Sequence, residues 1–356
     1  MKIIVACGGT GGHSFPGIAV AKELAGRGHE VAIWASGRDI ESSVLKSWEG
    51  PVFSTRARQL RLKYIFSILS SIFRCMRAMK RAKPDVLLAM GSYSSLPPVL
   101  AAHHYHVPVV LHEANTIPGK AVEFLSRYAK VVATSFEITK NHLHRTKVEL
   151  TGLPIRGEIA KGTRFDFIPS GSWTIFVTGG SQGAHRVNEL ASEALCIVKQ
   201  ELDKRQSHGR KLYVIHQTGS ADEPWVMAKY AEAGLPARVH AFEREMANAF
   251  ASADLVVARA GASTCFELAA CAKPTLFIPL PSAMRNHQHF NADAFAAKGA
   301  AAEAKQSMLT AKNLARFIIN AYDNPGKLAD MSDRIRALAP VDAAAKVADL
   351  VEKSAE

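Results

Sequence analysis

Two glycine-rich segments occupy equivalent places in the two halves of this chain, and each lies between an apolar run and a helical pattern. Residues 8–13 (GGTGGH) follow the run at 3–6, and residues 179–184 (GGSQGA) follow the run at 174–177. A strand that ends at clustered glycines and continues as a helix presents unpaired backbone N–H groups at the positive end of the helix dipole, which is a geometry that binds phosphate or diphosphate. The pair therefore predicts two α/β halves that each face a phosphorylated ligand.

Length and composition are those of a globular chain with room for about two domains. Of its 356 residues, 48% are hydrophobic and 21% are charged, which is typical of soluble proteins. No stretch approaches the ~18 apolar residues of a transmembrane helix, and we expect no secretory signal because the first apolar run is short. The five cysteines lack a C-x-x-C spacing, which fits a reducing cytoplasm and offers no disulfide or zinc framework.

Short apolar runs alternate with helical patterns along both halves. Strands are predicted at residues 3–7, 30–35, 85–89, 107–111, 131–134 and 147–150, and again at 174–177, 212–216, 239–242, 255–258 and 275–278. Short buried strands separated by helices indicate βαβ units and parallel sheets. We therefore predict an α/β fold of two Rossmann-like, doubly wound domains, at 1–156 and 157–335, with a hinge at 151–156. A closing helix is expected at 342–353.

Ligands of doubly wound sheets bind beyond the carboxyl ends of the strands. The polar residues that suit chemistry fall mostly at such places, namely at 10–13, 90–93, 112–115, 181–184, 242–243, 259–267 and after 279. Neither glycine-rich segment is a nucleotide fingerprint of the common kinds. The first lacks the third glycine of G-x-G-x-x-G and the acidic residue that should follow the second strand, and neither ends in Gly-Lys-Ser/Thr.

Residues 259–267 (RAGASTCFE) follow a predicted strand and open a helix. Their small and hydroxyl side chains suit a diphosphate at a helix N-terminus. Glu267 lies one turn after Ser263 on the same helix face, where a carboxylate could accept both hydroxyls of a ribose. The alternative for Glu267 is an acidic residue that stabilises the helix dipole.

A basic segment carries much of the net charge of +12. Residues 51–84 contain no Asp or Glu but nine Lys or Arg, and between the cations lies an apolar helical pattern that includes Ile65, Phe66, Leu69 and Phe73. An apolar helix flanked by cations is typical of an anchor at an anionic membrane surface. The alternative is a core helix with a solvated basic end. No nucleic-acid-binding signature is present, so we expect no nucleic acid partner.

Several motifs, taken in order, resemble one family. They are residues 8–13 with Pro16 and Gly17, 83–86 with 90–93 (MGSY), 112–115 (HEAN), 179–184, 259–267 and 288–292 (QHFNA). Together they resemble the MurG family of N-acetylglucosaminyltransferases, which convert lipid I to lipid II in peptidoglycan synthesis. The resemblance spans the chain and implies a GT-B fold, in which residues 1–156 bind acceptor and membrane, 157–335 bind the donor, and the helix of 336–356 returns to the first domain.

The resemblance also implies a donor site for UDP-N-acetylglucosamine. Ser181, Ala262, Ser263, Thr264 and Arg156 would surround the diphosphate, Glu267 would bind the ribose, the backbone near Glu243 would meet the uracil, and Gln288 and Asn115 would contact the sugar. Thr10, Gly11 and Gly12 would face the diphosphate of undecaprenyl-linked lipid I and are counted among the donor contacts as well. The membrane would be the cytoplasmic face of the bacterial inner membrane.

The implied reaction is inverting, with the muramoyl 4-hydroxyl attacking C1 of N-acetylglucosamine as UDP leaves. His13 is the candidate base, because a histidine suits proton transfer at neutral pH. The equally open alternative is that His13 caps the helix or binds the acceptor diphosphate. No Asp-x-Asp occurs, so neither a metal nor another cofactor is expected.

Four positions depart from the family pattern: Leu153 stands where Asn is common, Ala114 where Gln is, Ser92 where Gly is, and Glu243 where an aliphatic residue is. A backbone contact to uracil survives the last change. Polar contacts made by the usual side chains at 153 and 114 cannot be transferred to this chain. The alternative functions are another GT-B transferase, a UDP-sugar epimerase, or a non-catalytic membrane-associated binder of nucleotide sugars.

Overall fold

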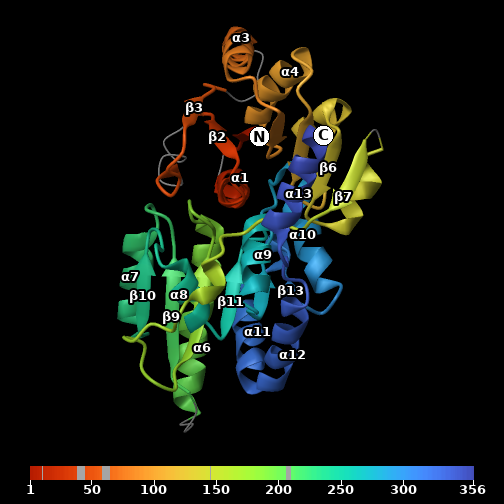
Figure 1. Ribbon diagram of the computed structural model, residues 1–356. Helices are drawn as coiled ribbons and strands as arrows, with labels where there is room; N and C mark the ends of the chain where they lie inside the picture. The colour runs from red at the N-terminus through yellow and green to blue at the C-terminus, as the bar shows by residue number, and fades with distance from the viewer. Residues whose placement is uncertain (10, 38–44, 58–64, 145, 206–209) are drawn as a thin grey trace. The chain divides into compact units, whose positions relative to one another are not determined.

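The computed structural model describes residues 1–9, 11–37, 45–57, 65–144, 146–205 and 210–356. Their contacts divide the chain into two compact units. Unit 1 comprises Met1–Arg156 together with Pro340–Glu356, and unit 2 comprises Gly157–Ala339. Each unit is a parallel sheet with helices on its faces (Figure 1).

Unit 1 is built on a seven-stranded sheet in the order β3-β2-β1-β4-β5-β6-β7, and each neighbouring pair is parallel. Its strands are β1 Lys2–Ala6, β2 Glu30–Ala35, β3 Val52–Ser54, β4 Val86–Ala89, β5 Val109–Glu113, β6 Val131–Thr134 and β7 Lys147–Leu150. Its helices are α1 Gly11–Gly26, α3 Ile65–Ala82, α4 Leu96–His104, α5 Lys120–Leu125 and α13 Ala343–Ala355. Short 3₁₀ turns lie at Tyr93–Ser95, Ser126–Tyr128 and Glu137–His142.

Side chains of β1 alternate between two cores, one on each face of this sheet. Ile3 and Val5 pack with α1 and α13, whereas Ile4 and Ala6 pack with α3 and α4. The closing helix is held by Arg27, the residue after α1, whose Nη1 donates to Asp349 (2.6 Å) and Glu352 (2.9 Å). These contacts raise the pKa of Arg27, so the guanidinium stays charged. The end of the chain thus completes the core of unit 1.

Unit 2 contains a six-stranded parallel sheet in the order β10-β9-β8-β11-β12-β13. The strands are β8 Trp173–Thr178, β9 Leu212–Gln217, β10 Ala237–His240, β11 Leu255–Ala258, β12 Thr275–Phe277 and β13 Ala302–Glu303. The helices are α6 His185–Lys204, α7 Glu223–Glu232, α8 Met246–Ser252, α9 Ala262–Ala270, α10 His287–Ala296, α11 Ala311–Asp323 and α12 Pro325–Arg336. Short 3₁₀ turns lie at Ile159–Lys161, Met284–Asn286 and Gln306–Met308.

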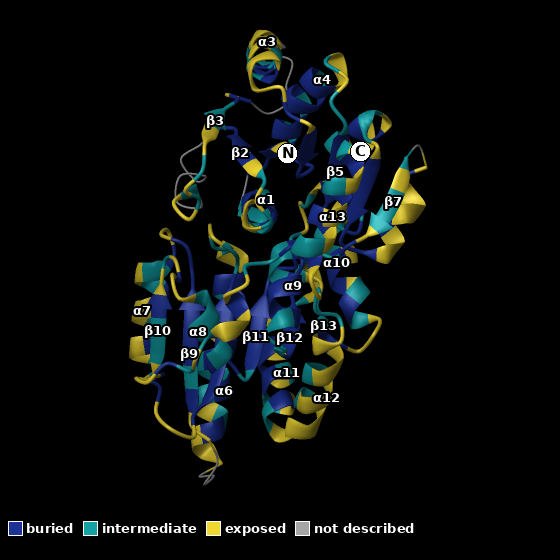
Figure 2. Ribbon diagram, viewed as in Figure 1, coloured by how far each residue is buried: buried dark blue, intermediate teal, exposed yellow. Residues whose placement is uncertain are grey.

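Both glycine-rich segments follow the strand at which the strand order reverses. β1 lies between β2 and β4, and β8 lies between β9 and β11, so each segment opens at the switch point where doubly wound sheets bind ligands. β8, β11 and β12 are buried along their whole lengths, as are β4, β5 and β6 (Figure 2). Strands covered on both faces are mostly apolar, and the polar residues of these strands lie mainly at their ends, as His112 and Glu113 do in β5.

The predicted fold class is confirmed, but some details differ. The expected strand at 107–111 is Val109–Glu113, because Pro108 cannot donate a hydrogen bond to the ladder and the strand begins after it. The expected strand at 239–242 is Ala237–His240. β3 and β13 were not predicted; both are short edge strands of three and two residues, too short for a recognisable pattern.

Candidate functional site

The first glycine-rich segment is braced by two serines that follow β4. Ser92 Oγ and Ser94 Oγ donate to Gly8 O at 2.6 and 2.7 Å. Gly9 has a φ of +118° and packs against Ser92, so a side chain there would be strained. The serine at position 92, where the family usually has glycine, therefore supplies a hydroxyl that holds this segment. Thr10 lies outside the described residues.

His13 lies half-buried in the first turn of α1. The backbone of the loop that follows β4 sets the orientation of its ring. Its Nδ1 lies 2.8 Å from Met90 O. A carbonyl oxygen only accepts, so Nδ1 carries the hydrogen, and Nε2 is the basic nitrogen of the neutral ring. Ser14 Oγ donates to Cys7 O at 2.9 Å and closes the turn into the helix. A ring held in this way could take up a proton at Nε2 or, once protonated, bind an anion.

Behind this loop, the end of β5 buries two titratable side chains. His112 donates through Nε2 to Gly152 O at 3.4 Å, whereas its buried Nδ1 has no hydrogen-bond partner in the part of the chain that the structure describes. Burial lowers the pKa of His112 to about 4, so the ring is neutral. Burial raises the pKa of Glu113, against the hydrogen bonds that it accepts from Asn115 and Gly119.

Glu113 determines where Asn115 lies. Its Oε1 accepts from the backbone N (2.8 Å) and Nδ2 (3.1 Å) of Asn115, and its Oε2 accepts from Gly119 N (2.9 Å). The family resemblance implied Asn115 as a sugar contact, and sequence reasoning did not assign Glu113 this orienting role. The sequence contained a signal for this contact, because Glu113 and Asn115 lie only two positions apart in the 112–115 motif.

Three further positions of unit 1 bear on the predicted site. The Arg156 guanidinium lies over the Phe15 ring, 4.6 Å from its centroid, so it packs beside α1. Leu153 is fully buried and Ala114 is 5% exposed. Both departures from the family pattern are therefore apolar core positions, and neither side chain offers a polar contact to a ligand.

The second glycine-rich segment is held differently, by the ends of β8 and β9. Thr178 Oγ1 accepts from Gly180 N at 3.1 Å, and Gln217 Nε2 donates to Gly180 O at 2.9 Å. Gly183 has a φ of +73°, and a Cβ atom there would overlap Thr218 O. Only glycine permits this close approach. Ser181, at the tip of the segment, is exposed.

The start of α9 adds a second helix N-terminus to unit 2. Gly261 is its N-cap, and Ala262, Ser263 and Thr264 form its first turn. Ser263 Oγ is buried and finds no hydrogen-bond partner among the described residues, as expected for a hydroxyl that binds a ligand. Glu267 follows one turn later and is 7% exposed.

Two side chains connect the loop before α9 to adjacent segments by hydrogen bonds. Arg259 donates through Nη1 to Ile278 O (2.9 Å) and Pro279 O (3.0 Å), and burial lowers its pKa to about 10. Asn291 of α10 is fully buried and donates to Ala260 O at 3.2 Å. Sequence reasoning had not assigned these supporting roles, because the partners are backbone carbonyls far along the chain.

Gln288 and Glu243 were both predicted near the donor. Gln288 Oε1 accepts from Leu280 N at 3.0 Å, so a ligand would meet its NH₂ group. The Glu243 carboxylate is 2% exposed and accepts from Arg238 Nε (3.1 Å) and Glu245 N (2.9 Å). The carboxylate of Glu243 thus binds protein groups, so uracil would contact only the backbone of this residue.

The helix α3 has a buried face and an exposed apolar face. Ser71, Cys75 and Met79 are buried on one side, whereas Phe66 and Phe73 are exposed on the other by 84% and 68%. Leu69, between these two rings at helical spacing, is 46% exposed. The buried side agrees with the expected core helix, whereas the exposed apolar side leaves the alternative of a membrane anchor as a prediction. The side chain of Ile65 lies outside the described residues.

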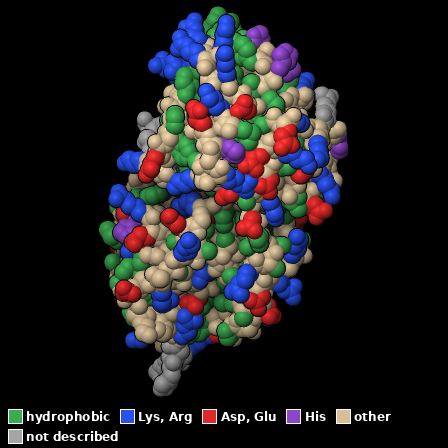
Figure 3. Space-filling model, viewed as in Figure 1, with side chains coloured by type: hydrophobic (Ala, Val, Ile, Leu, Met, Phe, Trp, Pro, Cys, Tyr) green, Lys and Arg blue, Asp and Glu red, His purple; other side chains and the backbone are tan. Residues whose placement is uncertain are grey.

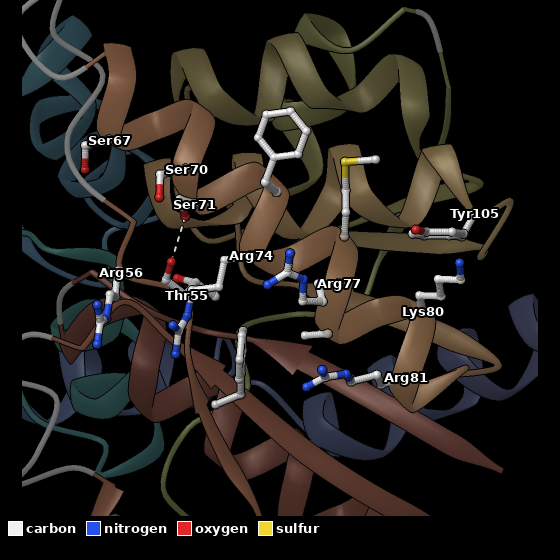
Figure 4. A pocket seen from close by; sticks show the side chains of 14 residues that line it. Thr55, Arg56, Ser67, Ser70, Ser71, Arg74, Arg77, Lys80, Arg81 and Tyr105 are labelled. Atoms are coloured by element: carbon white, nitrogen blue, oxygen red, sulfur yellow. Dashed lines mark hydrogen bonds between the residues drawn. The ribbon is translucent and has the colours of Figure 1, made fainter.

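A basic groove of about 950 Å³ runs beside α3 (Figure 4). Its described lining contains no acidic side chain and includes the cations Arg56, Arg74, Arg77, Lys80 and Arg81. Arg74 is tied down through Nε to Ser54 O at 2.7 Å, and Ser71 Oγ donates to Thr55 O at 2.8 Å. Lys and Arg side chains gather at the end of unit 1 where α3 lies (Figure 3).

The predicted site residues thus separate into two groups. Unit 1 holds Gly11, Gly12, His13, Asn115, Arg156, Phe66, Leu69 and Phe73, and unit 2 holds Ser181, Glu243, Ala262, Ser263, Thr264, Glu267 and Gln288. Within the described ranges, no group of three His, Cys, Asp or Glu residues could hold a metal ion. Nor does any described helix combine the length and apolar character needed to cross a membrane.

Two family models match the chain. The glycosyltransferase family 28 N-terminal domain matches residues 3–134, and the C-terminal domain of the same family matches residues 174–352. A curated relative from Myxococcus xanthus is 36% identical, covering 98% of this chain and 92% of the relative. A relative from Geobacter metallireducens is 35% identical, covering 98% and 97%. Both are named UDP-N-acetylglucosamine–N-acetylmuramyl-(pentapeptide) pyrophosphoryl-undecaprenol N-acetylglucosamine transferase.

Solved structures agree with this result. The crystal structure of MurG from Acinetobacter baumannii is 32% identical, with a TM-score of 0.78 over 99% of this chain and 100% of that one. A UDP-N-acetylglucosamine 2-epimerase from Neisseria meningitidis, bound to UDP-N-acetylglucosamine, gives a TM-score of 0.73 at 17% identity. At that identity the epimerase shows the fold alone. Two Rossmann-like domains of this kind constitute the GT-B fold.

Proposed function

Because this chain belongs to the MurG family of glycosyltransferases, we infer that it transfers N-acetylglucosamine from UDP-N-acetylglucosamine to the muramoyl sugar of lipid I, forming lipid II. The observation that carries this function is sequence identity of 34–36% over nearly the whole chain to relatives named for this reaction. The enzyme is therefore a hexosyltransferase that acts in peptidoglycan synthesis.

We propose that the donor binds in unit 2. The diphosphate of the nucleotide sugar would meet two helix N-termini. One is that of α6, after the second glycine-rich segment, and the other is that of α9, where the unpartnered Ser263 hydroxyl would donate a hydrogen bond. Glu267, one turn into α9, would accept the ribose hydroxyls, and the NH₂ group of Gln288 would bind the sugar. Aligned backbone N–H groups stabilise the negative charge that develops on departing UDP.

The acceptor is assigned to unit 1, where the first glycine-rich segment would bind the diphosphate of lipid I. His13 Nε2 would take the proton from the attacking muramoyl 4-hydroxyl, because its Nδ1 is committed to Met90 O. Asn115, whose side chain is held by Glu113, would be a further contact to the N-acetylglucosamine of the donor. Attack on C1 from the side opposite UDP inverts the configuration at that carbon.

The membrane contact is assigned to α3, on the cytoplasmic face of the bacterial inner membrane. Its exposed Phe66, Leu69 and Phe73 would enter the headgroup boundary, while the cations of the basic groove would meet anionic lipids. This peripheral attachment would bring the enzyme to the surface that carries the undecaprenyl-linked acceptor.

A radiolabel transfer assay tests the proposed function. The full chain is incubated with labelled UDP-N-acetylglucosamine and a lipid I analogue, and we expect one labelled disaccharide lipid for each UDP released. Label recovered as an epimerised sugar would indicate an epimerase instead. Tight binding of UDP-N-acetylglucosamine without turnover would indicate a non-catalytic binder.

A further inference from the structure

A chain of hydrogen-bonded side chains leads from the core of unit 2 to the start of α6. Tyr230 OH donates to His216 Nδ1 (2.9 Å), and His216 Nε2 donates to Asn188 Oδ1 (3.1 Å). Asn188 Nδ2 donates to Asp222 Oδ2 (2.7 Å), and His185 Nδ1 donates to Asp222 Oδ1 (2.8 Å). The Asp222 carboxylate can only accept, so its partners must donate, and the direction of every earlier bond follows.

The network is buried inside and exposed at one end. His216, Asn188 and Asp222 are at most 6% exposed, whereas the side chain of His185 is 67% exposed. Burial lowers the pKa of His216 to about 3, so this inner ring is neutral. Burial alone would raise the pKa of Asp222. Hydrogen bonds from Trp225, Asn188 and His185 outweigh burial, so the pKa of Asp222 is lowered overall. Asp222 is therefore a fixed negative charge beneath His185.

The same network supports the second glycine-rich segment. Asn188 Nδ2 also donates to Thr218 O at 2.8 Å, and Gly183 packs directly against that carbonyl. His185 itself is the first residue of α6, immediately after the segment. The position of its ring is thus coupled to the backbone that we assign to the donor diphosphate.

A cation at the first residue of a helix is unusual, because the helix dipole opposes it. Here the hydrogen bond to Asp222 raises the pKa of His185. Glu189, 3.4 Å from its Nε2, also favours the protonated ring, whereas Arg186 opposes it. A bound diphosphate would make this placement favourable, because the helix N-terminus and the protonated ring both attract an anion.

We propose that protonated His185 supplies a cation to the donor-diphosphate site, so that binding of the nucleotide sugar is coupled to uptake of a proton by this residue. The inference rests on the proposed function, since it takes the second glycine-rich segment as the donor site. Asp222 acts in it as a positioning residue, because it works only through the ring that it holds.

The sign of the effect follows from the charges. Each phosphorus of a nucleotide-sugar diphosphate carries one strongly acidic oxygen, so the ligand keeps its charge across the neutral range. When His185 is neutral, Asp222 and Glu189 leave net negative charge beside the loop, offset in part by Arg186. Protonation of His185 cancels one of these charges. Affinity should therefore be highest at low pH and fall as pH rises through the titration of His185.

Calorimetric titration of the full chain with UDP-N-acetylglucosamine, from about pH 6 to about pH 8.5, tests the proposal. Wild-type affinity should fall about threefold to tenfold over this range, since one pKa unit of coupling corresponds to about tenfold. Repeating the titration in buffers of different ionisation enthalpy should show net proton uptake. His185→Gln should bind weakly at every pH, and His185→Arg should bind tightly without the pH dependence.

Tight binding by His185→Arg would show that the charge at this position matters. A purely structural role of the histidine ring would not be restored by a different side chain. Asp222→Asn should shift the pH dependence to lower pH, because the ring loses its carboxylate partner. His144→Gln, at an exposed position of unit 1, is the matched control and should behave as wild type. Persistence of the wild-type pH dependence in His185→Gln, or weak binding by His185→Arg, would overturn the inference. Tight but pH-independent binding by the wild type would overturn only the inference about His185. No binding at any pH would overturn the proposed function as well.

Discussion

The two glycine-rich segments each carry a histidine in the first turn of the following helix, and the two rings are anchored through the same atom to different partners. His13 Nδ1 donates to the carbonyl of Met90, whereas His185 Nδ1 donates to the carboxylate of Asp222. A carbonyl sets the tautomer and leaves Nε2 as the basic nitrogen, but a carboxylate also stabilises the protonated ring. Similar loops thus present a ring suited to taking a proton in unit 1 and a ring suited to binding an anion in unit 2.

The support beneath the segments differs in the same way. The first is held by Ser92 and Ser94, two hydroxyls from the adjacent loop, whereas the second rests on a network that reaches the core at Tyr230. The comparison predicts that changes in unit 1 affect chemistry and membrane contact, and that changes in unit 2 affect donor affinity.

The largest effect is expected from His13→Ala. If Nε2 is the base, turnover should fall roughly 100-fold or more, while the affinity for UDP-N-acetylglucosamine stays near that of wild type. Steady-state rates and calorimetry on the same preparation measure both quantities, with His144→Ala as the control. A variant that keeps most of its turnover would reduce His13 to a helix cap or an acceptor ligand.

Glu267→Ala should show the opposite pattern. Loss of the carboxylate leaves the ribose hydroxyls unpaired and should weaken donor binding by about 1–3 kcal/mol. Glu267→Gln, which keeps an accepting oxygen, should lose less. Calorimetry with UDP is sufficient as the measurement, and unchanged affinity in Glu267→Ala would remove Glu267 from the ribose site.

Replacing Phe66, Leu69 and Phe73 together with serine should weaken vesicle binding on the order of tenfold or more, because the apolar contribution is lost. The binding that remains should be sensitive to salt. Arg77→Glu with Arg81→Glu should have the complementary effect, at about 1 kcal/mol for each charge, mainly at low salt. Co-sedimentation with anionic vesicles measures both variants, and UDP binding by unit 2 should not change. Vesicle binding that neither variant alters would place the membrane contact elsewhere.

The smallest effect concerns the two buried, neutral histidines. The pKa of His112 is lowered to about 4 and that of His216 to about 3, so the unfolded chain binds their protons more readily than the folded chain does. Stability should therefore fall as pH decreases below about 6.5, by at most about 1.4 kcal/mol per pH unit for each histidine. Urea unfolding against pH measures the slope. His112→Gln should reduce the slope, and an unchanged slope would show that His112 is not protonated on unfolding.

Sequence patterns predicted those features that depend on local order. Glycines at 8–12 and 179–183, continuous apolar strands, and the spacing of Ser263 and Glu267 are all visible along the chain. The support for these residues was not visible, because Arg259 and Asn188 bind groups about 20 to 34 positions away. For α3 the pattern showed a wide apolar arc, but only the packed structure divides it into a core face and an exposed face.

We propose above all that unit 2 binds the donor at the second glycine-rich segment. Amide hydrogen exchange of the full chain, with and without UDP-N-acetylglucosamine, tests this most directly, because bound phosphate oxygens protect the N–H groups that they contact. We expect the strongest slowing of exchange at residues 180–186 and 261–267, and weaker changes at residues 8–13. Protection concentrated at residues 8–13, with none at either segment of unit 2, would contradict the account.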